Sequence, residues 1–547
     1  MTDAPLSSPA PPATAMLPRR ALLLLFIGAL VLRLAHALAM SDSPYFGHPV
    51  IDGQEYVRAA IAIARGKGHP DPVYWHPPGY PYFLASIWSL SRGGYLLPRV
   101  LQACLGALVV VFTAWMGTRS FGRRVGMAAG VGASLYGILI YFDGEILAAS
   151  LGVFLVVGAA VLGMLAKQRG SRLLWAAAGL GGGAATLTVA SSVIVPLLLA
   201  VHARRRFPWV LLGLAVAVAP ATLHNYRHGK EFVLVSYNGG INFWIGNNPQ
   251  YDRMVSVRPD ADWLRLVNEP ARAGVAGRAA ASAYFARKVL RWAANDPAGF
   301  LRLQAHKLRL LLSGNEIFRN QAIYPARQHS PILRVLLWKV PGLAFPFGFL
   351  LPLAGLGLWV GARRAPLPAA LVAGLAAMVL LFFVTARYRV PLVPFLLVFA
   401  AAGGEWLVRQ ASRLQRLAAA SAMTPLFLLA NLGQGPMDSR MNADAEYSLA
   451  TSLGEEGRMA EAMALFESTV ASRPSYGEAW MNLSVCYEHF GRAEEARAAM
   501  KRAYDLDPAF TVEAIHRFKR EGKAETAARL ECYLREAAGA SAPVRSP

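Results

Sequence analysis

Two adjoining stretches near the start of the chain decide the class of fold: ALLLLFIGALVLRLAHALAM (residues 21–40) and SDSPYFGHPVIDGQEYVRAAIAIARGKGHPDPVYWHPPGYP (residues 41–81). The first stretch is apolar over about the 20 residues that an α-helix needs to cross a bilayer. The second carries Asp42, His48, Asp52, Glu55, Arg58, Asp71 and His76. Charge and unpaired backbone are expensive in lipid, so the second stretch must lie at or outside the membrane face.

The composition extends this membrane character to the rest of the chain. Of the 547 residues, 55% are hydrophobic and 16% are charged, whereas soluble domains are about 25% charged. The net charge of +22 is uneven, because residues 1–436 hold 41 basic and 15 acidic side chains, while residues 437–547 hold 14 and 18. Much of the basic excess lies in short loops beside apolar runs, as the positive-inside rule expects. We therefore predict an all-α, polytopic membrane protein that binds no nucleic acid.

The apolar runs predict about eleven spans. Arg19 and Arg20 precede the first span and place the amino terminus in the cytoplasm. Residues 173–203 are too short for two full spans and predict two shortened helices that turn around Gly181–Gly183. The predicted spans are 21–40, 95–118, 125–142, 146–166, the pair within 173–203, 208–223, 335–361, 366–385, 390–408 and 414–433.

The polar segments between the spans complete the predicted organisation. Residues 1–18 are rich in Pro, Ala and Ser and predict disorder. The membrane domain, 19–436, has two outer loops, 41–81 and 225–333. Within and just after the first loop, residues 77–92 predict a short helix along the interface, with Tyr80, Tyr82 and Trp88 as anchors. Eleven spans put the carboxy terminus outside, whereas ten would leave it in the cytoplasm.

The tail, 437–547, contains a repeat with a period of 34 residues. Gly457 and Gly491 stand one period apart, as do Pro474 and Pro508. This period and the accompanying apolar positions are typical of tetratricopeptide repeats. A degenerate third unit at about 511–537 is expected to cap the α-solenoid. The repeats either hold a protein partner or serve as a structural appendage.

Three carboxylates are candidates for catalysis at the outer face. Asp52 could act as a general base toward a hydroxyl or bind a metal, or it could cap the helix that follows it. Asp143 and Glu145 follow the span 125–142 and are therefore predicted on the same face. If the carboxylates converge, Asp52 and Glu145 could hold a divalent cation such as Mg²⁺ or Mn²⁺.

Other polar residues of the outer face are candidates for substrate binding. His76, in YWHPPGYP, could contact phosphate or sugar, while its aromatic neighbours also suit an interfacial anchor. Arg387 and Arg389 flank Tyr388 where the positive-inside rule does not expect them. Their guanidinium groups could bind a lipid phosphate or could extend along the interface. Asn247 and Asn248 lie in a segment whose turns could shape a pocket.

Together these motifs resemble the GT-C superfamily of membrane glycosyltransferases. The similarity is to the protein mannosyltransferase and aminoarabinose transferase family (glycosyltransferase family 39), in a bacterial form with tetratricopeptide repeats. It covers about residues 20–410 and the tail. The segments that carry it are the first loop with Asp52 and Tyr56, PPGYP with Tyr80, FDGEIL, GGINFWIGNNP and RYRVPLVPFLL.

The resemblance implies a reaction and a set of roles. A sugar would pass from a polyprenyl-phosphate donor to a hydroxyl of a protein or glycolipid at the periplasmic face of a bacterial inner membrane. Asp52 would be the catalytic base, Glu145 with Asp143 would be the second acidic position, and Arg387 or Arg389 would neutralise the lipid phosphate. One departure concerns the acceptor: the protein mannosyltransferases have adjacent Asp and Glu in the first loop, whereas here Gly53 follows Asp52.

Two other functions remain open from the sequence. A non-catalytic membrane scaffold could use the repeats to recruit partners for envelope assembly. A flippase or polymerase could handle polyprenyl-linked glycans without single-sugar transfer. We expect Asp52→Asn to abolish function in a transferase and to leave a scaffold unaffected.

Overall fold

The computed structural model describes residues 16–91, 93–255, 261–319, 323–433, 439–520, 522 and 524–537. Over these residues the chain is almost entirely helical and has one two-stranded antiparallel hairpin. Residues 1–15, most of the segment predicted to be disordered, lie outside the described residues. The all-α fold predicted from the sequence is confirmed.

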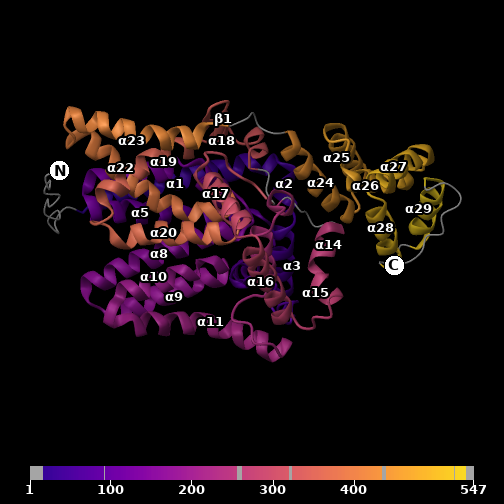
Figure 1. The fold of residues 1–547 in the computed structure, drawn as a ribbon, viewed down its shortest axis with the longest axis horizontal. Helices are drawn as coiled ribbons and strands as arrows, with labels where there is room; N and C mark the ends of the chain where they lie inside the picture. Colours follow the sequence, from indigo (N-terminus) through magenta and orange to yellow (C-terminus); the bar gives the residue numbers. More distant parts are fainter. Residues whose placement is uncertain are drawn as a thin grey trace.

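A bundle of helices contains all of the segments predicted to span the membrane (Figure 1). By length and composition, five segments of the described chain could cross a bilayer, or six if the bent pair α6 and α7 counts as one. The helices of the bundle are α1 (Arg19–Ala39), α5 (Leu96–Phe121), α6 (Arg123–Ser134), α7 (Gly137–Gly144), α8 (Ala148–Arg169), α9 (Arg172–Thr188), α10 (Ile194–Ala203), α11 (Phe207–Gly229), α19 (Phe347–Gly361), α20 (Pro366–Leu381), α22 (Val393–Arg409) and α23 (Arg413–Asn431).

The outer surface of the bundle is apolar. Leu24 on α1 is 70% exposed and Val216 on α11 is 57% exposed. Exposed apolar side chains along helices of this length suit contact with lipid tails rather than with water. The surface therefore supports a membrane-embedded bundle.

Three sequence predictions about the bundle need correction. The pair α9 and α10 turns at the 3-10 helix Ala190–Val193, not around Gly181–Gly183. The glycines lie inside α9, where a Cβ on Gly183 would stand 2.5 Å from the Cβ of Ala217 on α11. Gly183 therefore serves close packing of helices, as small residues often do in membranes, and the three glycines form no turn.

The other two corrections concern the segments 335–361 and 77–92. The first begins as a hairpin of β1 (Trp338–Val340) and β2 (Leu343–Phe345), and only the shorter apolar helix α19 follows it. In the second, α4 (Gly79–Leu90) forms, but Tyr80 is fully buried and donates a hydrogen bond to Gln102 Oε1 at 2.6 Å. Tyr80 is therefore part of the packed interior and does not anchor an interface.

The outer loops form short helices at one end of the bundle, between the bundle and the tail (Figure 1). The first loop contributes α2 (Pro44–Gly47) and α3 (Asp52–Ala64), and α4 follows. The long loop and its continuation contribute α12 (Gly239–Gly246), α13 (Tyr251–Val255), α14 (Ala261–Val267), α15 (Glu269–Arg272), α16 (Arg278–Asn295), α17 (Pro297–Leu312) and α18 (Pro331–Leu336), and α21 (Ala386–Arg389) precedes α22.

The tail forms three helix pairs, as the repeat predicts. Gly457 and Gly491 occupy equivalent positions after the first helix of a pair, with φ of +82° and +72°, a conformation that glycine adopts without cost. The helices are α24 (Ser439–Glu455), α25 (Met459–Ser472), α26 (Gly477–His489), α27 (Ala493–Leu506), α28 (Pro508–Arg520) and α29 (Ala524–Ala537).

The repeats dock onto the first outer loop. His48 Nδ1 lies 2.7 Å from Glu456 Oε1, and Gln54 Nε2 donates to Glu455 Oε2 at 2.9 Å. The repeats therefore lie at the same end of the bundle as Asp52. The ten-span alternative, which separates them from that end, does not fit these contacts.

Candidate active site

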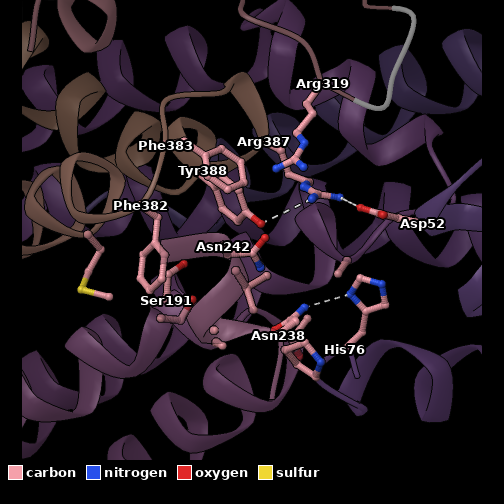
Figure 2. A pocket seen from close by; sticks show the side chains of 18 of the residues that line it. Asp52, His76, Ser191, Asn238, Asn242, Arg319, Phe382, Phe383, Arg387 and Tyr388 are labelled. Atoms are coloured by element: carbon pink, nitrogen blue, oxygen red, sulfur yellow. Dashed lines mark hydrogen bonds and ion pairs between the residues drawn. The ribbon is translucent and has the colours of Figure 1, made fainter. Parts of the chain in front are cut away.

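One cavity at this end of the bundle brings together residues from segments far apart in the sequence (Figure 2). It measures about 170 Å³. Its wall combines the start of α3, the segment before α4, the turn between α9 and α10, the start of α12, the end of α20 and the start of α21. Charged and amide side chains and a group of apolar side chains from α20 both contribute to the lining.

Asp52 and Arg387 form an ion pair inside the cavity, with Arg387 Nη1 against Asp52 Oδ2. Asp52 is the first residue of α3, and the preceding Ile51 has a φ of +53°, which is strained for a β-branched residue. Burial alone would raise the pKa of Asp52, but Arg387, His76 and Arg319 hold that pKa at about 2. Asp52 is therefore a carboxylate surrounded by positive charge, and its role is not limited to the helix terminus.

Arg319 supplies a second guanidinium group to the cavity. It reaches in from the loop after α17, beside Arg387 (Figure 2), and lies 4.6 Å from the centroid of the Phe383 ring. The Tyr388 hydroxyl lies 3.4 Å from Arg387 Nη2. Two arginines on aromatic supports present a fixed positive surface, which suits a phosphate group.

His76 lies between Glu55 and Asn238. Its Nε2 lies 2.8 Å from Glu55 Oε2, and its Nδ1 lies 3.3 Å from the side-chain amide of Asn238 (Figure 2). Burial lowers the pKa of His76, but the hydrogen bond to Glu55 and the charge of Asp52 outweigh it, so the pKa is raised. Tyr56 supports the imidazole edge to face, with ring centroids 5.5 Å apart. The ring is thus held in place with its charged form favoured.

The opposite wall of the cavity is apolar. It comes mainly from α20, through Leu375, Met378, Val379 and Phe382. Ser191 and Ser192 of the turn between α9 and α10 and Asn242 of α12 lie beside this wall and offer hydrogen bonds. A cavity with a cationic side and an apolar side can hold an amphiphile whose anionic head meets the arginines.

The other two carboxylates predicted for the site lie elsewhere. Asp143 pairs with Arg33 at 2.7 Å and accepts a hydrogen bond from Ser150 at 2.5 Å, deep in the bundle. Glu145 lies beside Arg99 and accepts a hydrogen bond from the Tyr141 hydroxyl. Neither lines the cavity. The expected convergence of three carboxylates does not occur, because α7 turns these two toward basic partners inside the bundle.

Four predicted binding residues are also outside the cavity lining. Tyr80 bonds to Gln102, as described above, and Arg389 forms a buried pair with Glu316 at 2.7 Å. Asn247 accepts hydrogen bonds from Lys307 at 2.9 Å and Gln304 at 3.0 Å, and Asn248 caps its own turn through Ile245 O and the Gln250 amide. These residues fix the loops that carry the site. Tyr56, His76, Arg387 and Tyr388 do line the cavity, as predicted.

The surroundings of Asp52 do not fit a divalent cation. Its neighbours are the side chains of Arg387, Arg319 and His76, whose positive charge opposes a metal ion. Among the described residues, no group of three or more His, Cys, Asp or Glu side chains could hold a metal. Glu145, the second ligand considered from the sequence, is not in the cavity. No step is therefore assigned to Mg²⁺ or Mn²⁺.

Several residues of the cavity were not predicted from the sequence. Asn238 directly precedes the Gly-rich segment of the long loop, and Asn242 lies within it. The segment was therefore correctly singled out, but its cavity residues lie at its start and not at Asn247 and Asn248. Arg319 stands in an irregular loop among many other arginines, and no local pattern distinguishes it. Glu55 lies one helical turn after Asp52, a spacing that could have indicated it.

The fold and the cavity define a helical membrane protein with a tetratricopeptide tail. Residues 447–509 match the family described as tetratricopeptide repeat, which confirms the repeats predicted from the 34-residue period. A search of curated proteins returns no match.

Among solved structures, the apo oligosaccharyltransferase of Archaeoglobus fulgidus matches with 15% identity and a TM-score of 0.40, over 78% of this chain and 57% of that one. This chain therefore spans little more than half of that protein. ArnT of Cupriavidus metallidurans, bound to undecaprenyl phosphate, matches with 14% identity and a TM-score of 0.41, over 95% of this chain and 76% of that one.

Proposed function

We propose that this chain is a membrane glycosyltransferase that moves a sugar from a polyprenyl-phosphate donor to a hydroxyl acceptor. One observation carries the proposal: a single cavity contains a carboxylate, two guanidinium groups and an apolar wall, at Asp52, Arg387, Arg319 and the face of α20. The carboxylate suits the acceptor, the guanidinium groups suit the phosphate, and the apolar wall suits the first isoprene units of the lipid.

The reaction is a direct displacement at the anomeric carbon. The acceptor oxygen forms a bond to that carbon while its proton moves to the Asp52 carboxylate. The bond between the anomeric carbon and the phosphate oxygen breaks, and its electron pair leaves with polyprenyl phosphate. The leaving group gains one negative charge, which Arg387 and Arg319 stabilise as it develops. A displacement of this kind inverts the configuration of the sugar.

The ion pair of Asp52 and Arg387 makes catalysis depend on the donor. A carboxylate with a pKa of about 2 is a weak base while Arg387 holds it. A bound phosphate competes for the same guanidinium group, and loosening the pair raises the basicity of Asp52. Asp52 then accepts a proton most readily when a donor is in place, which limits unproductive proton transfer.

The placement of basic residues supports a periplasmic site in a bacterial inner membrane. Lys167 and Arg169 end α8, whose first residue, Ala148, lines the cavity, so these charges lie at the opposite end of the bundle. The triplet Arg204–Arg206 lies between α10 and α11, again away from the turn that reaches the cavity. Basic residues concentrate on the cytoplasmic side of inner-membrane proteins. The cavity and the repeats then face the periplasm.

The test is donor turnover by the full-length protein in lipid nanodiscs. Undecaprenyl phosphates linked to mannose, glucose, galactose or aminoarabinose are supplied together with a bacterial envelope extract that contains protein and glycolipid acceptors, and release of undecaprenyl phosphate is measured by mass spectrometry. We expect Asp52→Asn to lower turnover by about 10²–10⁴-fold, the usual contribution of a general base. Asp42→Asn is the matched control, because Asp42 is an exposed carboxylate of the same loop outside the cavity.

The same assay separates the alternatives. No consumption of any donor by the wild type would contradict the proposal and favour the scaffold, whereas turnover by Asp52→Asn equal to that of the wild type would contradict the role of Asp52 as base. Products that carry more than one added sugar would indicate a polymerase. A change in the glycans of envelope proteins or glycolipids between cells with and without the chain identifies the acceptor.

A further inference from the structure

A second cavity lies between the repeats and the first outer loop. It measures about 680 Å³, about four times the 170 Å³ of the cavity around Asp52. Its wall comes from α24 and α26, with contributions from α28 and α29, and from Ile51 and Gln54 of the first loop. We refer to it as the repeat cavity. The repeats, which lie beyond the α2 and α3 end of the bundle in Figure 1, are thus open toward the candidate active site.

The two cavities share one wall residue. Ile51 lines both the repeat cavity and the cavity that contains Asp52. Ile51 immediately precedes Asp52, so the wall that the two cavities share adjoins the candidate base. The hydrogen bond from Gln54 to Glu455 holds α24 against α3 beside this shared wall.

From this arrangement we infer that the repeat cavity binds the acceptor, and that the acceptor is an extended polypeptide bearing a Ser or Thr hydroxyl. This inference rests on the proposed function and specifies its acceptor. The polypeptide lies along α24 and α26 and directs one hydroxyl past Ile51 toward Asp52. The donor enters the other cavity from the membrane side.

The lining of the repeat cavity suits a polypeptide backbone. Thr451 on α24 and Asn482 on α26 are both half-buried and line the cavity. The Thr451 hydroxyl donates to the Tyr447 backbone oxygen at 2.9 Å and the Asn482 amide to the Tyr447 hydroxyl at 3.3 Å, and the side-chain oxygens of Thr451 and Asn482 can in turn accept hydrogen bonds from backbone amides. Phe466, Val485 and Phe518 supply apolar contacts between such polar groups. The lining thus offers both hydrogen-bonding and apolar groups, which a polypeptide can meet with its backbone and its side chains.

The charge of the lining specifies the kind of polypeptide. Glu455, Glu488 and Glu525 line the cavity together with Arg529, so carboxylates outnumber guanidinium groups. Arg529 is already engaged, since it lies 2.8 Å from Glu488 and 2.8 Å from Glu525. The excess of negative charge favours a neutral or basic segment over an acidic one.

The position of the repeat cavity argues against a glycolipid acceptor. The acyl chains of a glycolipid stay in the bilayer, so its head group approaches from the membrane side. The repeat cavity lies on the other side of the first loop, among helices that pack on α3 and α14 and away from the apolar surface of the bundle. A polypeptide from the aqueous side reaches it without leaving water.

Peptide binding by the full-length protein in nanodiscs tests the inference. The probes are two pools of fluorescein-labelled ten-residue peptides with a central Ser or Thr: one with Lys, Gln, Ala and Gly flanks, the other with Asp and Glu in place of Lys. We expect the basic pool to bind and the acidic pool to bind at least tenfold more weakly. Thr451→Val and Asn482→Leu, which keep side-chain size, should each raise the Kd for the basic pool at least tenfold.

Three controls make the outcome decisive. Lys501→Ala, at an exposed position of α27 outside the repeat cavity, should bind like the wild type, and circular dichroism checks that each variant is folded. Equal binding by the wild type and both cavity variants overturns the inference, and so does binding of lipid A micelles but of neither peptide pool. Asp52→Asn should bind the basic pool normally and fail to glycosylate it. If Asp52→Asn glycosylates normally, the role of Asp52 as base fails, and if the wild type binds the basic pool but glycosylates no peptide with any donor, the proposed function fails while the peptide site stands.

Discussion

Two neighbouring arginines of one motif have opposite roles. Arg387 lines the cavity with its side chain 14% exposed, whereas the side chains of Arg389 and Glu316 are each 3% exposed. Arg389 also donates hydrogen bonds to the backbone carbonyls of Leu311, Ser313 and Asn315. Arg389 thus ties the loop after α17 to α21, whereas Arg387 lies in the cavity, paired with Asp52.

Arg389→Leu should therefore destabilise the protein. It leaves a buried carboxylate and several carbonyls without their donor, and breaking a buried pair costs about 3–5 kcal/mol. We expect a clear fall in Tm in detergent, measured by intrinsic fluorescence. Arg387→Lys is the matched variant: it keeps a cation beside Asp52, so its Tm should change little while donor turnover falls about 10²-fold. The reverse pattern would mean that the two arginines have exchanged roles.

His76 should give the protein a pH-dependent stability. The groups that face it are Glu55, Asp52 and Arg387, and the carboxylates prevail, so its folded pKa lies above the unfolded value of about 6.5. The charged imidazole therefore stabilises the fold fully below about pH 6.5, and this contribution is lost as pH rises through the folded pKa. Asp52 affects stability in a different pH range. Its pKa is about 2 in the folded protein and about 3.8 in the unfolded chain, so the stability that it contributes is lost only as the pH falls below about 3.8.

The Tm of the wild type and of His76→Gln, measured between pH 5 and pH 9, checks this expectation. The difference in Tm between the two proteins should shrink as pH rises. Asp42→Asn serves as a control for general charge effects of the loop. A difference that is constant with pH would show that the charge of His76 contributes nothing.

At the scale of elements, glycines decide how the helices of the bundle meet. A Cβ on Gly179 of α9 would stand 2.1 Å from the backbone oxygen of Val210 on α11, while a Cβ on Gly181 would meet Ala159 at an ordinary 3.5 Å. The sequence shows a run of glycines that looks like a turn. Only the position of α11 shows that the side of α9 facing it needs glycines, because the two helices lie too close there for a larger side chain.

Gly179→Ala should consequently destabilise the bundle, and Gly181→Ala should not. Overpacking against backbone costs about 1–3 kcal/mol because neither helix can move freely. We expect Gly179→Ala to lower the Tm in detergent by several degrees and to reduce donor turnover, since the turn after α9 carries Ser191 and Ser192 into the cavity. Similar effects of the two substitutions would contradict this packing argument.

Features that depend on local sequence patterns were predicted, and features that depend on contacts between distant segments were not. The apolar runs and the 34-residue period predicted the helices and the repeats, because both are local patterns. Asp52, His76 and Arg387 were found because they break such a pattern at the outer face. Asp143 and Glu145 were misplaced because their partners, Arg33 and Arg99, lie on helices far away in sequence. Arg319 was missed because an irregular loop gives no periodic signal.

At the scale of the whole molecule, the contact between the repeats and the first loop links the membrane side of the repeats to the membrane side of the candidate active site. The repeat domain must lie on the same side of the membrane as Asp52, because His48 and Gln54 contact it directly. The proposed periplasmic site therefore requires periplasmic repeats. The native cysteines report on this, since Cys532 on α29 is exposed while Cys486 is buried.

Labelling of Cys532 by a membrane-impermeant maleimide provides the measurement. In cells whose outer membrane has been permeabilised, the wild type should be labelled and Cys532→Ser should not. Cys532→Ser combined with Gln168→Cys, which places a thiol at the exposed far end of α8, should be labelled only after the inner membrane is lysed. If Gln168→Cys is labelled while the inner membrane is intact and Cys532 is not, the protein has the opposite orientation in the membrane. The cavity that contains Asp52 and the repeats would then both face the cytoplasm, because their mutual contacts keep them on the same side of the membrane.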